Sequence, residues 1–136
     1  MVIPDLSQFF TQAGVHFAYL FGSRARGQER PDSDFDIAVW FPVELDALAR
    51  FKRGCDLQAR LEQALSGKVD LIILNDAKPV LQNEAVLRGL ALYPQNKEAI
   101  IRFEARLRQR YEDYAYSQRY FTEARKKRMD KHDAAS

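Results

Sequence analysis

Hydrophobic and polar positions follow one another along this chain with a spacing that changes several times, and each change predicts a new element. Residues 5–13 carry apolar side chains at helical spacing, and Gly14 ends that pattern. The apolar run 15–21 predicts a strand, and the polar stretch 24–33, which contains Pro31, predicts a loop. The chain therefore begins with a helix, a strand and a polar loop.

A second strand is predicted over 34–41, where apolar and polar residues alternate with a period of two. The alternation puts Phe35 and Ile37 on one face of the strand and the carboxylates of Asp34 and Asp36 on the other. Two acidic side chains therefore point the same way, about 6 to 7 Å apart along the backbone.

The following segments continue the alternation of helices and strands. Helical periodicity covers 44–65, and the apolar run 69–74, broken only by Asp70, predicts a buried central strand. A short helix over 79–88 and a brief edge strand over 91–93 come next. The order of elements predicts an α+β fold, a small mixed sheet flanked by helices.

The C-terminal part of the chain predicts one long helix, because 97–127 contains no Pro or Gly and repeats apolar residues along one side. Packing against the domain is its ordinary interpretation. A partner-binding face is the alternative, because a helix of about 30 residues extends roughly 45 Å. We expect one domain over 1–96, a helical extension of it over 97–130 and a flexible tail over 131–136.

The composition of the 136 residues, 46% hydrophobic and 29% charged, is typical of a soluble globular protein. The first apolar run is too short to span a bilayer, and the N-terminus lacks the features of a signal peptide, so a cytoplasmic protein without membrane contact is expected. A single cysteine, Cys55, excludes an internal disulfide.

The net charge of +2 is too small to indicate nucleic-acid binding by itself. Its distribution is uneven, because residues 98–131 contain ten Lys or Arg and six Asp or Glu. This basic end can meet an anionic partner. Nucleic acid is nevertheless not expected as a direct ligand, since acidic residues interrupt the basic ones throughout the segment.

Candidate chemistry begins where the first strand ends, at Gly22 and Ser23. Glycine at that position lets backbone N–H groups approach a phosphate, and the serine hydroxyl can donate to a phosphate oxygen. The pair alone is weak evidence, because a Gly-Ser turn after a strand is common. It is not a Walker A loop, since no Gly-Lys-Ser/Thr follows.

Three acidic residues, Asp34, Asp36 and Asp70, form the second candidate group. Carboxylates are ligands that Mg²⁺ prefers, and two such ions can activate an attacking hydroxyl and stabilise a leaving pyrophosphate. Asp34 can instead be a turn residue, and Asp70 can belong to a buried salt bridge. Asp36 is harder to explain otherwise, because an unpaired carboxylate in an apolar strand costs stability.

A Gly-Ser pair, ten residues, Asp-x-Asp and a later strand Asp together make one pattern, carried by Gly22, Ser23, Asp34, Asp36 and Asp70. This pattern resembles the nucleotidyltransferase superfamily whose small members share the catalytic core of DNA polymerase β. The resemblance implies that Ser23 contacts a nucleoside triphosphate. It also implies that Asp34 and Asp36 hold two Mg²⁺ ions, while Asp70 binds the catalytic ion and helps deprotonate the acceptor.

Within that superfamily, the runs 22–27 and 30–34 and the short length look like the minimal nucleotidyltransferase (MNT) antitoxins, over residues 1 to about 93. The resemblance implies a HEPN-domain ribonuclease toxin as partner, which is neutralised when AMP is transferred from ATP to one of its tyrosines. Arg24 and Arg26 can neutralise the β and γ phosphates, or be solvated loop arginines.

Two other functions stay open. One is nucleotidyl transfer to a small molecule of the aminoglycoside kind, although this chain offers only one long helix to enclose such an acceptor. The other is a non-catalytic antitoxin that acts by binding. The carboxylate group argues against the second, since a binding protein has no need of carboxylates in apolar strands.

Overall fold

Helices and strands are interspersed along the part of the chain that the computed structural model describes, residues 4–25, 27–28, 30, 33–94 and 96–135. The order confirms the predicted α+β class. The elements are α1 (Ser7–Ala13), β1 (Phe17–Phe21), β2 (Phe35–Trp40), α2 (Ala47–Leu65), β3 (Val69–Ile73), the 3-10 turn η1 (Leu74–Asp76), α3 (Pro79–Arg88), β4 (Leu90–Pro94) and α4 (Lys97–Ala135). They form two compact units, Met1–Phe103 and Glu104–Ser136.

The first unit is built on a four-stranded sheet with the order β3-β2-β1-β4. β1 is antiparallel to both of its neighbours, β2 and β4, whereas β2 and β3 are parallel and are joined through α2. The predicted edge strand near 91–93 is confirmed as β4. The predicted central position of 69–74 is wrong, because β3 is the other edge strand. Its apolar run reflects packing against α2 and does not mean that strands pair on both sides.

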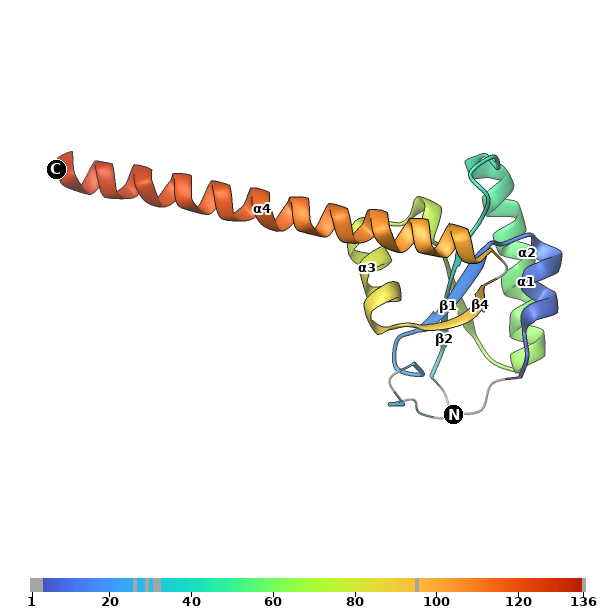
Figure 1. Cartoon of the computed structure of the whole chain (residues 1–136). Helices are drawn as coiled ribbons and strands as arrows, with labels where there is room; N and C mark the ends of the chain where they lie inside the picture. The colour runs from blue at the N-terminus through green and yellow to red at the C-terminus, as the bar shows by residue number, and fades with distance from the viewer. Residues whose placement is uncertain (1–3, 26, 29, 31–32, 95, 136) are drawn as a thin grey trace. The chain divides into compact units, whose positions relative to one another are not determined.

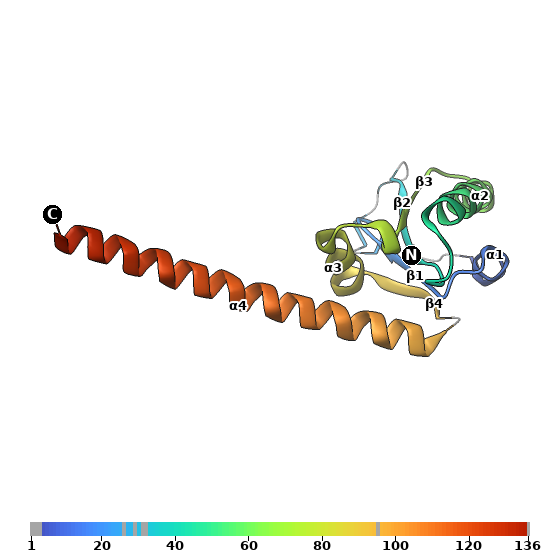
Figure 2. The same ribbon diagram turned by 90° about the horizontal axis from the view of Figure 1, so that it is seen from above.

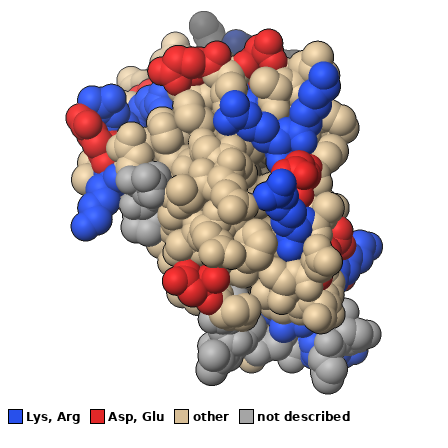
Figure 3. Space-filling model, turned by 90° about the vertical axis from the view of Figure 1, so that its right-hand side faces the viewer, with Lys and Arg blue, Asp and Glu red and all other residues tan. Residues whose placement is uncertain are grey.

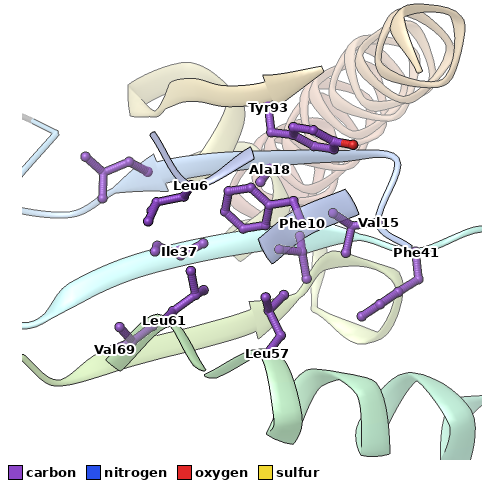
Figure 4. Packing of buried hydrophobic residues seen from close by; sticks show 12 residues of the cluster. Leu6, Phe10, Val15, Ala18, Ile37, Phe41, Leu57, Leu61, Val69 and Tyr93 are labelled. Atoms are coloured by element: carbon purple, nitrogen blue, oxygen red, sulfur yellow. The ribbon is translucent and has the colours of Figure 1, made fainter. Parts of the chain in front are cut away.

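Two helices cover one face of the sheet and α3 lies on the opposite face, as Figures 1 and 2 show from two directions. The core lies under α1 and α2. In Figure 4, Phe10 of α1 points into this core, and its ring centroid is 5.5 Å from that of Tyr93 on β4. Leu57 and Leu61 of α2 belong to the same core on this face of the sheet and are fully buried. The strand face that carries Ile37 is therefore the apolar face, as its alternation predicted.

Local chemistry explains where α2 begins and how closely it packs. The Asp46 side chain accepts a hydrogen bond from the Ala49 N–H at 2.8 Å, so the helix starts after this N-cap, later than the predicted residue 44. In the middle of the helix, a Cβ at Gly54 would lie 3.0 Å from Cδ1 of Ile73. A glycine that weakens an isolated helix thus lets this helix approach β3 closely.

The opposite face of the sheet holds an aromatic cluster of Phe17, Trp40 and Phe103. The rings of Phe17 and Trp40 are stacked with centroids 6.0 Å apart, and the Phe103 ring lies 5.3 and 4.9 Å from them. Phe103 belongs to the first turns of α4. These turns are therefore part of the first compact unit.

The second unit is helical from Glu104 to Ala135, so α4 runs past the end predicted near 127. The reason is that no Pro or Gly interrupts the chain and that Ala, Lys and Arg are good helix formers. Its larger aromatic side chains are exposed, namely those of Tyr111, Tyr114, Tyr116, Tyr120 and Phe121. The flexible tail over 131–136 stays a prediction.

Surface charge on the side of α1 and α2 is mixed. Figure 3 shows Lys and Arg side chains interspersed with Asp and Glu around an uncharged central area. On α2, Arg60 pairs with Asp56 at 3.0 Å and also donates to Gln12 of α1 at 2.9 Å. None of the helices in the described part of the chain is long and apolar enough to cross a membrane.

Candidate active site

Strand pairing brings the separate parts of the motif into one row across the sheet. Phe21, the last residue of β1, is the register partner of Asp36 in β2, and Asp36 is the register partner of Asp70 in β3. Register partners point to the same face of a sheet, and neighbouring strands lie about 4.8 Å apart. The structure therefore puts Asp36 and Asp70 side by side, next to the turn that begins at Gly22.

Gly22 is required at this turn for two separate reasons. Its φ of 76° lies in the left-handed region that favours glycine. In addition, a Cβ built on Gly22 would lie 2.1 Å from Oδ2 of Asp36. The Asp36 carboxylate thus lies against the backbone of the turn, in space that any side chain at position 22 would fill.

Backbone hydrogen bonds shape the turn that follows. The Ser23 carbonyl accepts from the Gln28 N–H at 2.9 Å, and the Arg24 carbonyl accepts from the Gly27 N–H at 3.4 Å. Gly27 also has a positive φ, 70°. These contacts hold Ser23, whose side chain is partly exposed, directly after the strand that carries Phe21.

Arg24 has contacts that neither interpretation of the sequence anticipated. Its guanidinium donates to the Ser33 carbonyl from Nε at 3.1 Å and from Nη2 at 2.7 Å. Its Cζ also lies 3.8 Å from the centre of the Phe35 ring. Arg24 therefore joins the two ends of the loop between β1 and β2. A phosphate contact by Arg24 stays a prediction, and Arg26 lies outside the described residues.

Asp34 lies one residue before β2 and is positioned partly by the loop. The Ser33 N–H donates to the Arg30 carbonyl at 3.0 Å, which makes a turn immediately before Asp34. Asp34 Oδ2 is 3.9 Å from Nζ of Lys68, and both side chains are well exposed, so this ion pair is weak. The pairing with Lys68 had no signal in the sequence, because it depends on β3 lying beside β2.

Carboxylate oxygens are the donor type that suits a divalent cation such as Mg²⁺. Asp36 and Asp70 are register partners, which suits the binding of a cation by both carboxylates. Both side chains are accessible to solvent, because Asp70 is exposed and Asp36 is partly exposed. The alternative of a buried salt bridge for Asp70 is therefore wrong. Within the described ranges, no three His, Cys, Asp or Glu side chains are close enough together to hold a metal ion. A joint cation site of Asp34, Asp36 and Asp70 therefore stays a prediction.

A hollow of about 470 Å³ lies at the opposite end of the sheet from these carboxylates. His16, which precedes β1, and Tyr93, near the end of β4, contribute to its lining. The Tyr93 hydroxyl and Thr11 Oγ1 share a hydrogen bond of 2.8 Å there. Because Gly22 and Asp36 lie at the other ends of their strands, this hollow is separate from the candidate active site.

Comparison with known families agrees with the row of residues described above. Residues 5–98 match the model of the polymerase beta nucleotidyltransferase family, and the chain belongs to this family. The predicted superfamily is therefore confirmed.

One curated relative indicates a more specific activity than the family does. The chain is 40% identical over 79 residues to the protein adenylyltransferase MntA of Shewanella oneidensis, a match that covers 58% of this chain and 54% of that protein. The chain thus spans about half the length of this curated relative.

Solved structures extend the similarity. A crystal structure of a toxin-antitoxin with AMP-PNP matches with a TM-score of 0.66 and 27% identity, over 85% of this chain and 91% of that chain. A structure of a tri-AMPylated Shewanella oneidensis HEPN toxin in complex with MNT antitoxin matches with a TM-score of 0.60 and 25% identity. This second match covers 85% of this chain and 88% of the other.

Proposed function

We propose that this protein is an antitoxin that transfers AMP from ATP to a tyrosine of a HEPN ribonuclease toxin and thereby neutralises it. The observation that carries the proposal is the row formed by Gly22, Asp36 and Asp70, in which a glycine turn suited to phosphate adjoins two register-paired carboxylates. The relatives support a protein acceptor and a toxin partner, because one is a protein adenylyltransferase and another is an antitoxin in complex with an AMPylated toxin.

The turn after β1 binds the nucleotide in this proposal. Its backbone N–H groups and the Ser23 hydroxyl donate to the triphosphate, which Gly22 admits because it has no side chain. The similarity to a structure of a toxin-antitoxin with AMP-PNP supports a nucleotide as substrate. ATP and the toxin are the two substrates of this proposed reaction, which takes place in the cytoplasm.

Asp34, Asp36 and Asp70 would hold two Mg²⁺ ions. When bound, these ions would neutralise the phosphates and lower the pKa of the acceptor hydroxyl. Asp70 accepts the proton of the tyrosine hydroxyl as the phenol oxygen bonds to the α-phosphorus. The bond from that phosphorus to the bridging oxygen of the β-phosphate breaks, and pyrophosphate leaves.

Intact-mass analysis of the toxin tests the proposal. The product of the neighbouring gene, taken as the candidate toxin, is incubated with ATP, Mg²⁺ and either the wild-type chain or Asp36→Asn, a variant that keeps the side-chain volume and removes the charge. Asp56→Asn on α2 is the matched control, because Asp56 is an exposed acid in an ion pair away from the motif. We expect one or more AMP additions with the wild type and with Asp56→Asn, and none with Asp36→Asn.

Three other results would contradict the proposal in different ways. A stable complex without any mass gain would indicate inhibition by binding. Neither complex nor mass gain, together with nucleotide transfer to an aminoglycoside, would indicate a small-molecule transferase. Transfer that continues after complete chelation of divalent cations would exclude the role given to the three carboxylates.

A further inference from the structure

We propose that Arg24 is a positioning residue that holds Asp34 in place for cation binding, and that it does not bind the triphosphate. The inference rests on the proposed function, because Asp34 is a cation ligand only in that reaction. Its basis is that Arg24 contacts both sequence neighbours of Asp34, the residue before it and the residue after it.

The contact before Asp34 fixes a peptide plane. The Ser33 carbonyl belongs to the peptide bond that joins Ser33 to Asp34, and it accepts from both Nε and Nη2 of Arg24, at 3.1 and 2.7 Å. Two donors from one planar group restrain the orientation of that carbonyl more than a single donor would. The orientation of the peptide plane in turn limits the positions that the Asp34 side chain can reach.

The contact after Asp34 fixes a side chain of the strand. The Arg24 guanidinium lies over the Phe35 ring, with 3.8 Å between Cζ and the ring centre. Such cation–π stacking is better suited to Arg than to Lys, because the guanidinium is planar and weakly hydrated. Arg24 thus restrains both neighbours of Asp34 from one position.

Asp34 needs this restraint more than Asp36 does. Asp36 has register partners on both sides, Phe21 and Asp70, so the sheet itself orients it. The ladder of β2 begins at Phe35, which leaves Asp34 outside the strand. A ligand on a loop loses more conformational entropy when it binds an ion than one that the surrounding structure already holds.

The same contacts argue against a phosphate role for Arg24. An arginine binds a phosphate or carboxylate most strongly through two parallel N–H donors. Nε and Nη2 form one such pair, and both already donate to the Ser33 carbonyl. Binding a phosphate through this edge would require Arg24 to release the loop.

Mn²⁺ binding measured by electron paramagnetic resonance, without nucleotide, tests the inference separately from catalysis. The variants are Arg24→Ala, Arg24→Lys and, as a matched loop control, Arg30→Ala, because Arg30 is exposed in the same loop. We expect Arg24→Ala to weaken Mn²⁺ binding roughly tenfold, as loss of a residue that supports a metal ligand does. Arg24→Lys should fail to restore binding, since an ammonium cannot reproduce the paired donors and the stacking. Arg30→Ala should bind like the wild type.

Steady-state transfer separates the two roles of Arg24. A positioning role lowers kcat and raises the Mg²⁺ concentration required, while KM for ATP stays within about twofold. Unchanged Mn²⁺ binding with KM for ATP raised tenfold or more would overturn the inference in favour of a phosphate contact. If Arg24→Ala does not fold, Phe35→Leu removes the stacking partner while keeping an apolar side chain against the core, and it should weaken Mn²⁺ binding less, in the same direction. An unchanged Mn²⁺ affinity in Phe35→Leu would then overturn the inference.

Failure of the proposed function would look different from failure of this inference. If Asp36→Asn binds Mn²⁺ like the wild type, the carboxylates are not the cation site, and both proposals fail. If Asp36→Asn loses Mn²⁺ binding and Arg24→Ala keeps it, only the positioning role of Arg24 fails.

Discussion

The two compact units of this chain contain similar aromatic side chains but use them differently. In the Met1–Phe103 unit, Phe10 and Phe17 are completely buried, whereas Tyr111 and Phe121 in the helical unit are 58% and 63% exposed. Burial in the first unit depends on helices that cover a sheet, and the second unit is a helix by itself. An aromatic residue at helical spacing therefore indicates a core only where a second layer is present to cover it.

The largest test of this difference replaces one phenylalanine in each unit. Phe10→Ala should lower the free energy of unfolding by about 3 to 5 kcal/mol, because it leaves a cavity among buried side chains. Phe121→Ala should change it by less than about 0.5 kcal/mol, because the ring is exposed. Urea unfolding followed by circular dichroism measures both. Similar losses for the two variants would mean that the exposed helix face stabilises the folded chain as much as the core does.

A second test sharpens the comparison within the first unit, between two glycines with positive φ. Gly22→Ala and Gly27→Ala carry similar backbone strain, about 1 to 2 kcal/mol. Only Gly22→Ala also brings a Cβ against the Asp36 carboxylate, since the space beside Gly27 is open. We expect Gly22→Ala to be the more destabilising variant in thermal unfolding, and to lose AMP transfer that Gly27→Ala retains.

Equal behaviour of these two glycine variants in both assays would show that backbone conformation alone explains the requirement at position 22. The close approach of the Asp36 carboxylate would then have no measurable consequence.

A smaller effect is expected from an ion pair near the start of α2. Arg50 donates to Asp76 at 3.0 and 2.6 Å, and this hydrogen bonding lowers the pKa of the Asp76 carboxyl below its usual value. Because the folded-state pKa is depressed, the stabilisation is present above the unfolded pKa near 3.9 and is lost as the pH falls through the folded value. The Asp76 side chain is 44% exposed, so screening limits the effect to less than about 1 kcal/mol.

Unfolding of Asp76→Asn and the wild type, compared at pH 7 and at several values from pH 5 down to pH 3, measures this contribution. The difference between the two proteins should shrink as the pH falls. Asp56→Asn is the control, since its exposed partner Arg60 lies one turn away on the same helix. A difference between Asp76→Asn and wild type that grows toward acid pH would contradict the assigned sign.

The smallest effect is expected from truncation of the helical unit. Ending the chain after Arg110 removes 111–136, and residues 111–130 of that segment, among them Tyr111 and Phe121, are mostly exposed. The unfolding free energy of the first unit should change by no more than about 0.5 kcal/mol, which denaturant unfolding can measure. A markedly less stable truncated chain would mean that the two units fold cooperatively.

Periodicity and turn residues predicted the identity of nearly every element, and their errors occurred where distant contacts decide. The strands around Phe21 and Asp36 were predicted because alternation and the Gly-Ser turn are local signals. The edge position of β3 was not, since its apolar residues pack against α2 and do not report how many strands lie beside it. The start of α2 was predicted three residues too early, because the prediction used hydrophobic spacing, whereas the N-cap at Asp46 determines where the helix begins.

The sequence by itself determined which residues are candidates for chemistry, because the Gly-Ser pair and the two acids of Asp-x-Asp lie in one hairpin whose spacing is local. It also determined the helical character of the C-terminal segment through the absence of Pro and Gly. Only the tertiary structure decided that Asp70 lies beside Asp36, because their parallel pairing requires α2 to return the chain across the sheet. The contacts of Arg24 with Ser33 and Phe35 were likewise decided by the tertiary structure. These residues are nine or more positions apart in the sequence, so their contact depends on how the chain between them folds.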